Sequence, residues 1–262
     1  MIVKPKKSLG QNFLNNIDVL SRIVDEGKIS NKDIILEIGP GTGNLTEKIL
    51  EKNPKELIVI EKDNYLSDLL KKKFGNNINI INDDILNCYK RLIFKEPIKI
   101  FGNLPYNIST KILTTLINVE KPSIVYKKII FVFQKEVADR IVALENSKKY
   151  GRLSILSSWK FENVKLFDIS PESFYPKPKI LSSLVIFLPK LKFENIKSQK
   201  NLEHITRIFF GQRRKMIKKP IKILFKDYLY VAEKLKLDLN LRPENISKEK
   251  YMEICKLYED LT

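Results

Sequence analysis

The sequence has few of the residues that build metal sites and disulfide frameworks: its 262 residues include two cysteines and one histidine. Cys88 and Cys255 are far apart and form no CxxC pair, so neither a zinc ribbon nor a disulfide framework is indicated, and we expect a reducing compartment. His204 alone cannot make a site with several histidine ligands or a mechanism that needs two histidines. The sequence therefore predicts chemistry without a metal.

Long hydrophobic runs are also missing. No apolar stretch reaches the roughly 20 residues that cross a bilayer, and Met1 to Gly10 are basic without an apolar core. We therefore expect a soluble, cytoplasmic protein with no membrane partner.

Acidic residues are outnumbered. The chain has 48 lysines and arginines against 31 aspartates and glutamates, a net charge of +17. Such an excess favours a polyanionic partner, which phosphate contacts and counterion release would bind. A genome biased toward lysine, isoleucine and asparagine would give a similar composition, so charge alone leaves the partner open.

A glycine-rich turn follows the first hydrophobic strand-like run. The residues 34–38 lead into Gly39-Pro40-Gly41-Thr42-Gly43, and an amphipathic segment that looks helical comes next. Such a turn lets a ligand approach the backbone, and a carboxylate about 20 residues further on, at the end of the next strand, can bind ribose hydroxyls. Glu61 has this position. A turn built only for tight packing of strand on helix is the alternative.

A third strand-like run, 78–81, ends near Asp84, whose carboxylate could accept a hydrogen bond from an adenine amine. The alternative for Asp84 is a helix cap or turn residue. Ribose and adenine ligands suit a dinucleotide or S-adenosylmethionine, and a line of polar residues at successive strand ends favours S-adenosylmethionine.

The segment 101–110 offers a second kind of binding chemistry. A short buried strand ends at Asn103, and Pro105 keeps Leu104 extended so that its carbonyl points in a fixed direction. The Asn103 side-chain oxygen and the Leu104 carbonyl could accept both hydrogens of an exocyclic amine while Tyr106 stacks on the base, as enzymes that modify flipped bases require. An ordinary turn after a strand is the alternative.

Alternating strands and helices through residue 133 predict an α/β fold with a doubly wound sheet. The runs 167–170 and 183–188 flank a proline turn and predict an antiparallel hairpin at its edge. We place a catalytic domain at residues 1–190 and a small all-α domain at 191–262. In that second domain, a helix over 201–218 would carry Arg207, Arg214 and Lys218 on one face, beside Arg213 and Lys215. This face would bind RNA phosphates, or it is only a solvated basic surface.

The motifs of this chain, in their order along the sequence, resemble those of the ribosomal RNA adenine dimethyltransferases, and most closely those of the KsgA type. They include 11–14, 37–41, Glu61, Asp84-Ile85, 103–106, 134–138, 150–154, 174–179 and 212–215. The resemblance implies a Rossmann-like methyltransferase fold and dimethylation, by S-adenosylmethionine, of the 6-amino groups of two adjacent adenosines near the 3′ end of small-subunit (16S) rRNA. The implied partner is the pre-30S particle, and we expect a monomer.

The resemblance also implies roles for single residues. Asn12 would bind the polar part of the cofactor, Leu14 would pack beside it, and Gly39, Gly41, Ile85 and Asn103 would complete its site. Phe174 would stack on the target adenine opposite Tyr106, with ordinary core packing as the alternative. Three other functions stay open: the Erm type, which modifies large-subunit rRNA, a non-catalytic assembly factor, and a DNA adenine methyltransferase. A nicotinamide-dependent oxidoreductase is more distant.

Overall fold

The computed structural model describes residues 3–6 and 9–262. The chain divides into two compact units, one of residues 1–138 and 163–189 and the other of residues 139–162 and 190–262. No helix in the described ranges is long and apolar enough to cross a membrane. The predicted boundary at residue 190 stays a prediction, because the second unit here also includes residues 139–162.

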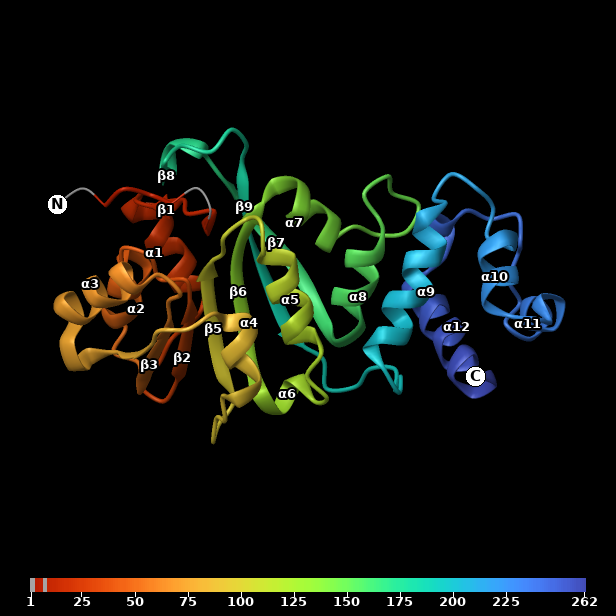
Figure 1. Cartoon of the computed structure of the whole chain (residues 1–262), viewed down its shortest axis with the longest axis horizontal. Coiled ribbons are helices and arrows are strands. Elements are labelled where there is room, and N and C mark those ends of the chain that lie inside the picture. Colours follow the sequence, from red (N-terminus) through yellow and green to blue (C-terminus); the bar gives the residue numbers. More distant parts are fainter. Residues whose placement is uncertain (1–2, 7–8) are drawn as a thin grey trace. The chain divides into compact units, whose positions relative to one another are not determined.

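A mixed sheet of seven strands, in the order β4-β3-β2-β5-β6-β9-β7, is the centre of the fold (Figure 1). Its strands are β2 (Ile34–Ile38), β3 (Glu56–Ile60), β4 (Asn79–Ile81), β5 (Ile98–Asn103), β6 (Tyr126–Gln134), β7 (Phe161–Ile169) and β9 (Ser182–Pro189). β2 to β6 pair in parallel, and β9 pairs antiparallel with β6. The predicted α/β class, doubly wound sheet and antiparallel edge are confirmed.

The strand order places a switch point at β2. The chain moves outward from β2 to β3 and β4, then returns to place β5 on the other side of β2. In open α/β sheets, a crevice forms where the order reverses, at the carboxyl ends of the strands. The residues that follow β2 and β5 therefore lie at the natural binding site of this sheet.

The side-chain pattern explains which strands are central and which lie at the edge. All five residues of β2 are buried, as expected for a parallel strand covered on both faces. β7 instead alternates exposed residues with buried or half-buried ones, the period of a strand with one solvated face. The sequence prediction found only the end of this strand, because charged residues interrupt its hydrophobic positions.

Helices cover both faces of the sheet. The helices of the first half are α1 (Ile17–Glu26), α2 (Asn44–Leu50), α3 (Asn64–Phe74), α4 (Ile85–Cys88), α5 (Ser109–Ile117) and α6 (Pro122–Val125). Residues of α1, α2 and α3 share one core with β2, β3, β5 and β6, and α4 and α5 lie over the opposite face (Figure 1). Asn16 caps α1 by accepting a hydrogen bond from the Val19 N–H at 3.0 Å.

Two very short strands form a separate ribbon. β1 (Phe13–Leu14) pairs antiparallel with β8 (Phe174–Tyr175), so that Leu14 lies opposite Phe174 and Phe13 opposite Tyr175. The segment before α1 is thereby tied to the segment that precedes β9.

The remaining elements are helical, as the sequence predicts for the C-terminal part. They are α7 (Lys135–Ile141), α8 (Arg152–Lys160), α9 (Gln199–Gly211), α10 (Lys218–Leu224), α11 (Tyr228–Lys234) and α12 (Lys248–Leu261). α8 packs on α9 and α12, and the Trp159 indole N–H donates to the Glu194 carbonyl at 2.7 Å. These contacts explain why residues 139–162 belong to the second compact unit.

Candidate functional site

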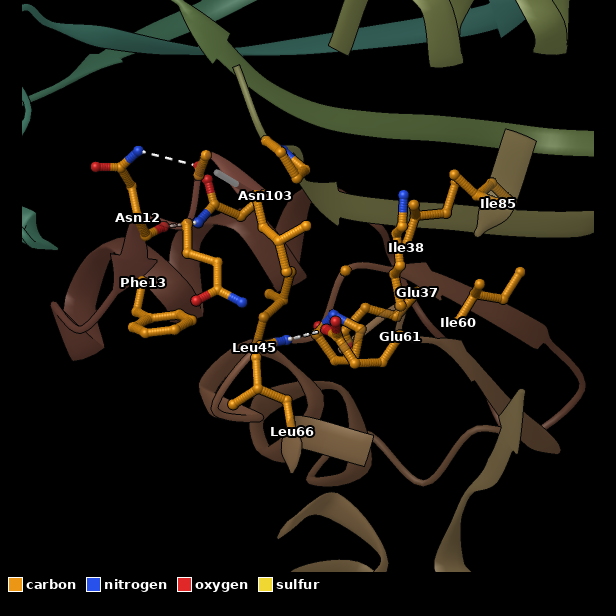
Figure 2. Close-up of a pocket in the computed structure, with 18 of the residues that line it drawn as sticks. Asn12, Phe13, Glu37, Ile38, Leu45, Ile60, Glu61, Leu66, Ile85 and Asn103 are labelled. Atoms are coloured by element: carbon orange, nitrogen blue, oxygen red, sulfur yellow. Dashed lines mark hydrogen bonds between the residues drawn. The ribbon is translucent and has the colours of Figure 1, made fainter. Parts of the chain in front are cut away.

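A pocket opens where β2, β3 and β5 end, at the switch point of the sheet (Figure 2). Asn12 and Asn103 lie together in it, apart from Glu37 and Glu61. The predicted site residues that line this pocket are Asn12, Leu14, Gly39, Gly41, Glu61, Asp84, Ile85, Asn103 and Pro105. Their elements come from distant parts of the sequence, and the sheet topology brings them to one place.

The glycine turn forms one wall of the pocket. Gly39 and Gly41 have φ angles of +67° and +60°, the left-handed region in which a side chain is strained. A Cβ atom on Gly41 would also lie 2.9 Å from the Phe13 ring. The turn therefore needs glycine for its backbone shape and for the close approach of the segment that carries β1.

Glu61 lies at the end of β3 and is buried, with an exposed fraction of 6 %. Its Oε2 accepts a hydrogen bond from the Gly41 N–H at 3.1 Å, and its Oε1 accepts one from the Asp63 N–H at 2.8 Å. Burial raises the pKa of Glu61, although these hydrogen bonds lower it in part. The carboxylate is thus held in one orientation with lone pairs still available to hydroxyl donors.

Glu37 is a second buried acid of the pocket, and it begins the predicted 37–41 motif at the end of β2. Its exposed fraction is 1 %, and its Oε2 has no hydrogen-bond partner among the residues that the structure describes. Burial raises the pKa of Glu37 to about 8, and the nearby Glu61 carboxylate adds to this increase. An unpaired buried oxygen beside a cavity is expected where a polar ligand binds.

Asp84 is both a helix cap and a pocket residue, the two roles that the sequence allowed. It caps α4 by accepting a hydrogen bond from the Leu86 N–H at 2.9 Å, and it also lines the pocket, as does Ile85. Its other oxygen accepts from Lys62 Nζ at 2.9 Å. Burial raises the pKa of Asp84, but the bonds from Lys62 and Leu86 outweigh it and the pKa is lowered. Asp84 is therefore a charged acceptor at the pocket edge.

Asn103 ends β5 with its amide oriented by the N-terminal segment. Its Nδ2 donates to the Asn12 carbonyl oxygen at 2.7 Å. Because the amide nitrogen is engaged there, the Oδ1 atom is the one available to accept a hydrogen bond from a ligand. The next residue, Leu104, has a buried side chain with an exposed fraction of 1 %, and Pro105 lines the pocket.

Tyr106 lies beside the pocket lining rather than in it. Its hydroxyl forms a hydrogen bond of 2.6 Å with the Oγ atom of Ser182, at the start of β9, and burial raises the pKa of Tyr106. The sequence gave no signal for this contact, because 76 residues separate the two side chains. The hydrogen bond fixes the ring of Tyr106 at one end.

The N-terminal segment is anchored over the pocket by side chains that sequence reasoning missed. Asn44 Nδ2 donates to the Leu14 carbonyl at 2.9 Å, and Gln11 Nε2 donates to Asp63 at 3.3 Å. Asn12 donates from its own side chain to the Gly10 carbonyl at 3.2 Å. The segment that places Asn12 is thus fixed at several points.

Phe174 is placed in the core and not in the pocket. Its exposed fraction is 4 %, and it packs in the cluster that contains Leu14 and Ile169. The core packing that the sequence left open for Phe174 is what the structure has, and its burial gives no support to the expected stacking on a base. The strand alternation of β8 turns the neighbouring Tyr175 outward instead.

The expected basic face of a single helix is wrong. α9 ends at Gly211 and α10 begins at Lys218, so Arg207 is not on the same helix as Arg214 and Lys218. Arg213 is half-buried and engaged inside the second unit, where it donates to Glu244 at 2.7 Å and to the Ser147 carbonyl at 3.2 Å. Arg207, Arg214, Lys215 and Lys218 are exposed.

The hydrogen-bonding groups of the pocket fit an adenosyl cofactor. Glu61 and Asp84 offer acceptors for ribose hydroxyls and an amine, the glycine turn offers close backbone approach, and Glu37 adds an unpaired oxygen. The sheet and this pocket define a Rossmann-like methyltransferase.

Comparison with known proteins gives the family. The family model of ribosomal RNA adenine dimethylases matches residues 2–260, and this chain belongs to that family. S-adenosylmethionine is accordingly its cofactor.

Individual relatives agree over the whole length. The chain is 54 % identical over 261 residues to the ribosomal RNA small subunit methyltransferase A of Pelagibacter ubique, which covers 100 % of this chain and 99 % of the relative. It is 41 % identical to the protein of the same name from Ehrlichia ruminantium, with 97 % of both chains covered.

Solved structures support the same fold. A dimethyladenosine transferase from Plasmodium falciparum superposes with a TM-score of 0.80 at 27 % identity, over 95 % of this chain and 98 % of that one. The 23S rRNA methyltransferase ErmE superposes with a TM-score of 0.69 at 19 % identity, over 94 % and 99 % of the two chains, which shows a shared fold alone.

Proposed function

We propose that this protein uses S-adenosylmethionine to dimethylate the 6-amino groups of two adjacent adenosines near the 3′ end of small-subunit rRNA. The observation that carries the proposal is the hydrogen bond from the Asn103 amide nitrogen to the Asn12 carbonyl, which leaves the amide oxygen to accept from a ligand beside an acid-lined pocket. The family supports adenine as the modified base. The names of the relatives from Pelagibacter and Ehrlichia support the small ribosomal subunit as the substrate.

Pocket residues have separate tasks toward the cofactor in this proposal. Glu61 accepts hydrogen bonds from the ribose hydroxyls. The turn at Gly39 and Gly41 lets the neighbouring part of the cofactor approach the backbone closely. Asp84 accepts a hydrogen bond from the adenine amine, while Ile85 packs against the adenine ring. Asn12 and Leu14 close the site from the N-terminal side. The lowered pKa of Asp84 keeps it ionised and therefore an acceptor at neutral pH.

The reaction requires alignment more than a strong base. When bound, S-adenosylmethionine supplies a methyl group on a positively charged sulfur. Asn103 Oδ1 and the Leu104 carbonyl accept hydrogen bonds from the two N–H groups of the target amine. These bonds turn the lone pair of the amine nitrogen away from the ring and toward the side of the methyl donor. The same acceptors stabilise the positive charge that develops on the nitrogen. Tyr106 stacks on the flipped base, and the proton leaves to water.

The exposed basic residues of the second unit are proposed RNA contacts. Arg207, Arg214, Lys215 and Lys218 are free of internal ion pairs within the described part of the chain and can approach phosphates. Arg213 is left out, because its guanidinium is engaged by Glu244 and Ser147. We keep the division into a methyltransferase domain and a small helical RNA-binding domain as part of the proposal.

One experiment separates the candidate functions. The protein is incubated with labelled S-adenosylmethionine and with small and large ribosomal subunits that lack the modification, and the labelled nucleotides are mapped. We expect label on two adjacent adenosines of small-subunit rRNA and labelling slower by a factor on the order of 100 or more with the Asn103→Ala variant. Label on large-subunit adenine would favour the Erm-type activity. Cofactor binding and subunit binding without any label would favour a non-catalytic assembly factor.

A further inference from the structure

An exposed loop beside the pocket carries hydrophobic side chains that the proposed chemistry does not use. The segment 176–181 connects β8 to β9. The exposed fractions are 48 % for Tyr175, the last residue of β8, 43 % for Ile180 and 39 % for Leu181. Phe174, directly before Tyr175, is buried, so the ribbon sends one aromatic ring inward and the next one out. We call Tyr175, Ile180 and Leu181 the outer platform.

Both ends of the outer platform are fixed to elements of the pocket. Tyr175 lies opposite Phe13 in the β1–β8 ribbon, and Phe13 lines the pocket. At the other end, Leu181 accepts a hydrogen bond from the Lys135 N–H at 2.9 Å, and Ser182 holds the hydroxyl of Tyr106 at 2.6 Å. The loop therefore lies next to the ring that is proposed to stack on the target base.

The charge around the outer platform suits a nucleic acid strand. Lys177 and Lys179 are exposed on the same loop. The Nζ atom of Lys177 forms an ion pair with the Oε1 atom of Glu172 at 2.5 Å. An exposed aromatic ring next to lysines is the combination that binds single-stranded nucleic acid, since the ring stacks on a base and the lysines attract its phosphate. A purely apolar protein partner would leave Lys179, which is not paired with Glu172, without a role.

A flipped adenosine leaves its neighbours close to the pocket mouth, and base-modifying enzymes select their sites partly through these flanking nucleotides. We propose that Tyr175, supported by Ile180 and Leu181, stacks on the base adjacent to the adenosine in the pocket. This proposal rests on the proposed function. In a substrate with two adjacent adenosines, the outer platform would hold one of them while the other is methylated.

The test uses unmodified small subunits whose rRNA carries 2-aminopurine next to the target adenosine, on its 5′ side in one preparation and on its 3′ side in another. Stacking quenches this base, so the intact protein should lower its fluorescence on one side. Tyr175→Ala should abolish the quench and raise KM for subunits by roughly 5- to 150-fold, the range that loss of base stacking gives. Its kcat at saturating subunits should change little.

Two further variants distinguish stacking from a structural role. Tyr175→Phe keeps the ring and should retain both quench and KM. Tyr65→Ala removes an equally exposed tyrosine, 50 % on α3, and should leave KM unchanged. Affinity for S-adenosylmethionine, measured by calorimetry, should be the same in all variants. If Tyr175→Ala failed to fold, Ile180→Ser would take its place in the same measurements.

Several results would overturn the proposal: unchanged quench and KM in Tyr175→Ala, equal impairment in Tyr175→Phe, or weakened cofactor binding in Tyr175→Ala. Failure of the proposed function has a different signature. In that case the intact protein would not methylate the small subunit. Quenching of 2-aminopurine placed in whichever RNA the protein does methylate would still show whether the outer platform stacks on a base.

Discussion

The Nδ2 atom of Asn103 donates a hydrogen bond to the carbonyl oxygen of Asn12 at 2.7 Å, across 91 residues of sequence. This bond decides which end of the amide faces the pocket. It also makes the acceptor geometry depend on the N-terminal segment, which Asn44 and Gln11 fix in place. The proposed base-binding residue is thus oriented by the same segment that closes the cofactor site.

The first prediction concerns Asn103 itself. Asn103→Ala removes the amine acceptor, so single-turnover methylation should fall by a factor on the order of 100 or more, as for loss of a preorganised transition-state contact. Cofactor affinity should fall far less than the methylation rate, because Glu61 and Asp84 remain in the pocket, and the melting temperature should change little. Asn118→Ala, at the end of α5, is a matched control and should keep the activity of the intact protein. Near-normal methylation by Asn103→Ala would contradict the proposed mechanism.

The second prediction concerns the acids of the cofactor site. Glu61→Ala and Asp84→Ala should each weaken S-adenosylmethionine binding by roughly 1.5 to 3 kcal/mol, the range of a lost hydrogen bond to a charged group. Asp68→Ala removes an exposed acid of α3 and serves as the control. Calorimetry measures all three affinities. Unaltered affinity in both pocket variants would remove Glu61 and Asp84 from the cofactor site.

The third prediction concerns Tyr106, whose ring face rather than hydroxyl is proposed to bind the base. Tyr106→Ala should lose about 1 to 3 kcal/mol of stacking on the flipped base. Tyr106→Phe should keep most activity but lower stability by about 1 to 3 kcal/mol, because it leaves the fully buried Ser182 hydroxyl without its partner.

The double variant Tyr106→Phe with Ser182→Ala checks this reasoning, since it removes both partners and should recover part of the lost stability. Thermal melts give the stability, and methylation of small subunits gives the activity. The expected order of activity is the intact protein, Tyr106→Phe, Tyr106→Ala and then Asn103→Ala. Tyr106→Phe as inactive as Tyr106→Ala would show that the hydroxyl is required.

Local sequence patterns were enough for the parts of the fold that depend on neighbours in the chain. The buried strands, the glycine turn and the acid at Glu61 were all predicted where the structure has them. Each follows from hydrophobic periodicity or from a turn with special dihedral angles. The order of the strands then turned these separate ends into one pocket.

The wrong helix prediction and the features that the sequence did not predict depend on long-range contacts. The periodicity that predicts one helix over 201–218 continues through a real break, where the Ile217 N–H donates to the Leu241 carbonyl and not to a helical partner. The same fold takes Arg213 to Glu244, 31 residues away. The burial of Phe174 and the bond between Tyr106 and Ser182 likewise need the β1–β8 ribbon and β9, which no local pattern describes.

The fourth prediction separates RNA contacts from internal ones in the second unit. Arg214→Ala, Lys215→Ala and Lys218→Ala should each lower the slope of log affinity against log salt by about 0.7 to 0.9, as for one lost phosphate contact. Arg213→Ala should leave the slope unchanged and lower the melting temperature by about 2 to 4 °C, since it breaks an ion pair inside the protein. A triple variant with an unchanged slope would mean that the exposed residues are only solvated.

The last prediction concerns pH and the buried Glu37. The pKa of this carboxyl is raised from 4.5 to about 8, mainly by burial, so the folded protein binds the Glu37 proton more tightly than the unfolded chain does. Its contribution to stability is therefore complete below about pH 4.5 and is lost as the pH rises through about 8.

Glu37→Gln keeps a neutral polar side chain and should remove this slope, so that the free energy of unfolding falls less between pH 5 and 8 than in the intact protein. Denaturant unfolding at several pH values across that range measures the free energy of unfolding of both proteins. Glu51→Gln changes an exposed acid at the end of α2 and should reproduce the slope of the intact protein. Parallel pH profiles for the intact protein and Glu37→Gln would mean that Glu37 is already ionised in the folded state, and its unpaired oxygen would then carry a charge into the pocket at neutral pH.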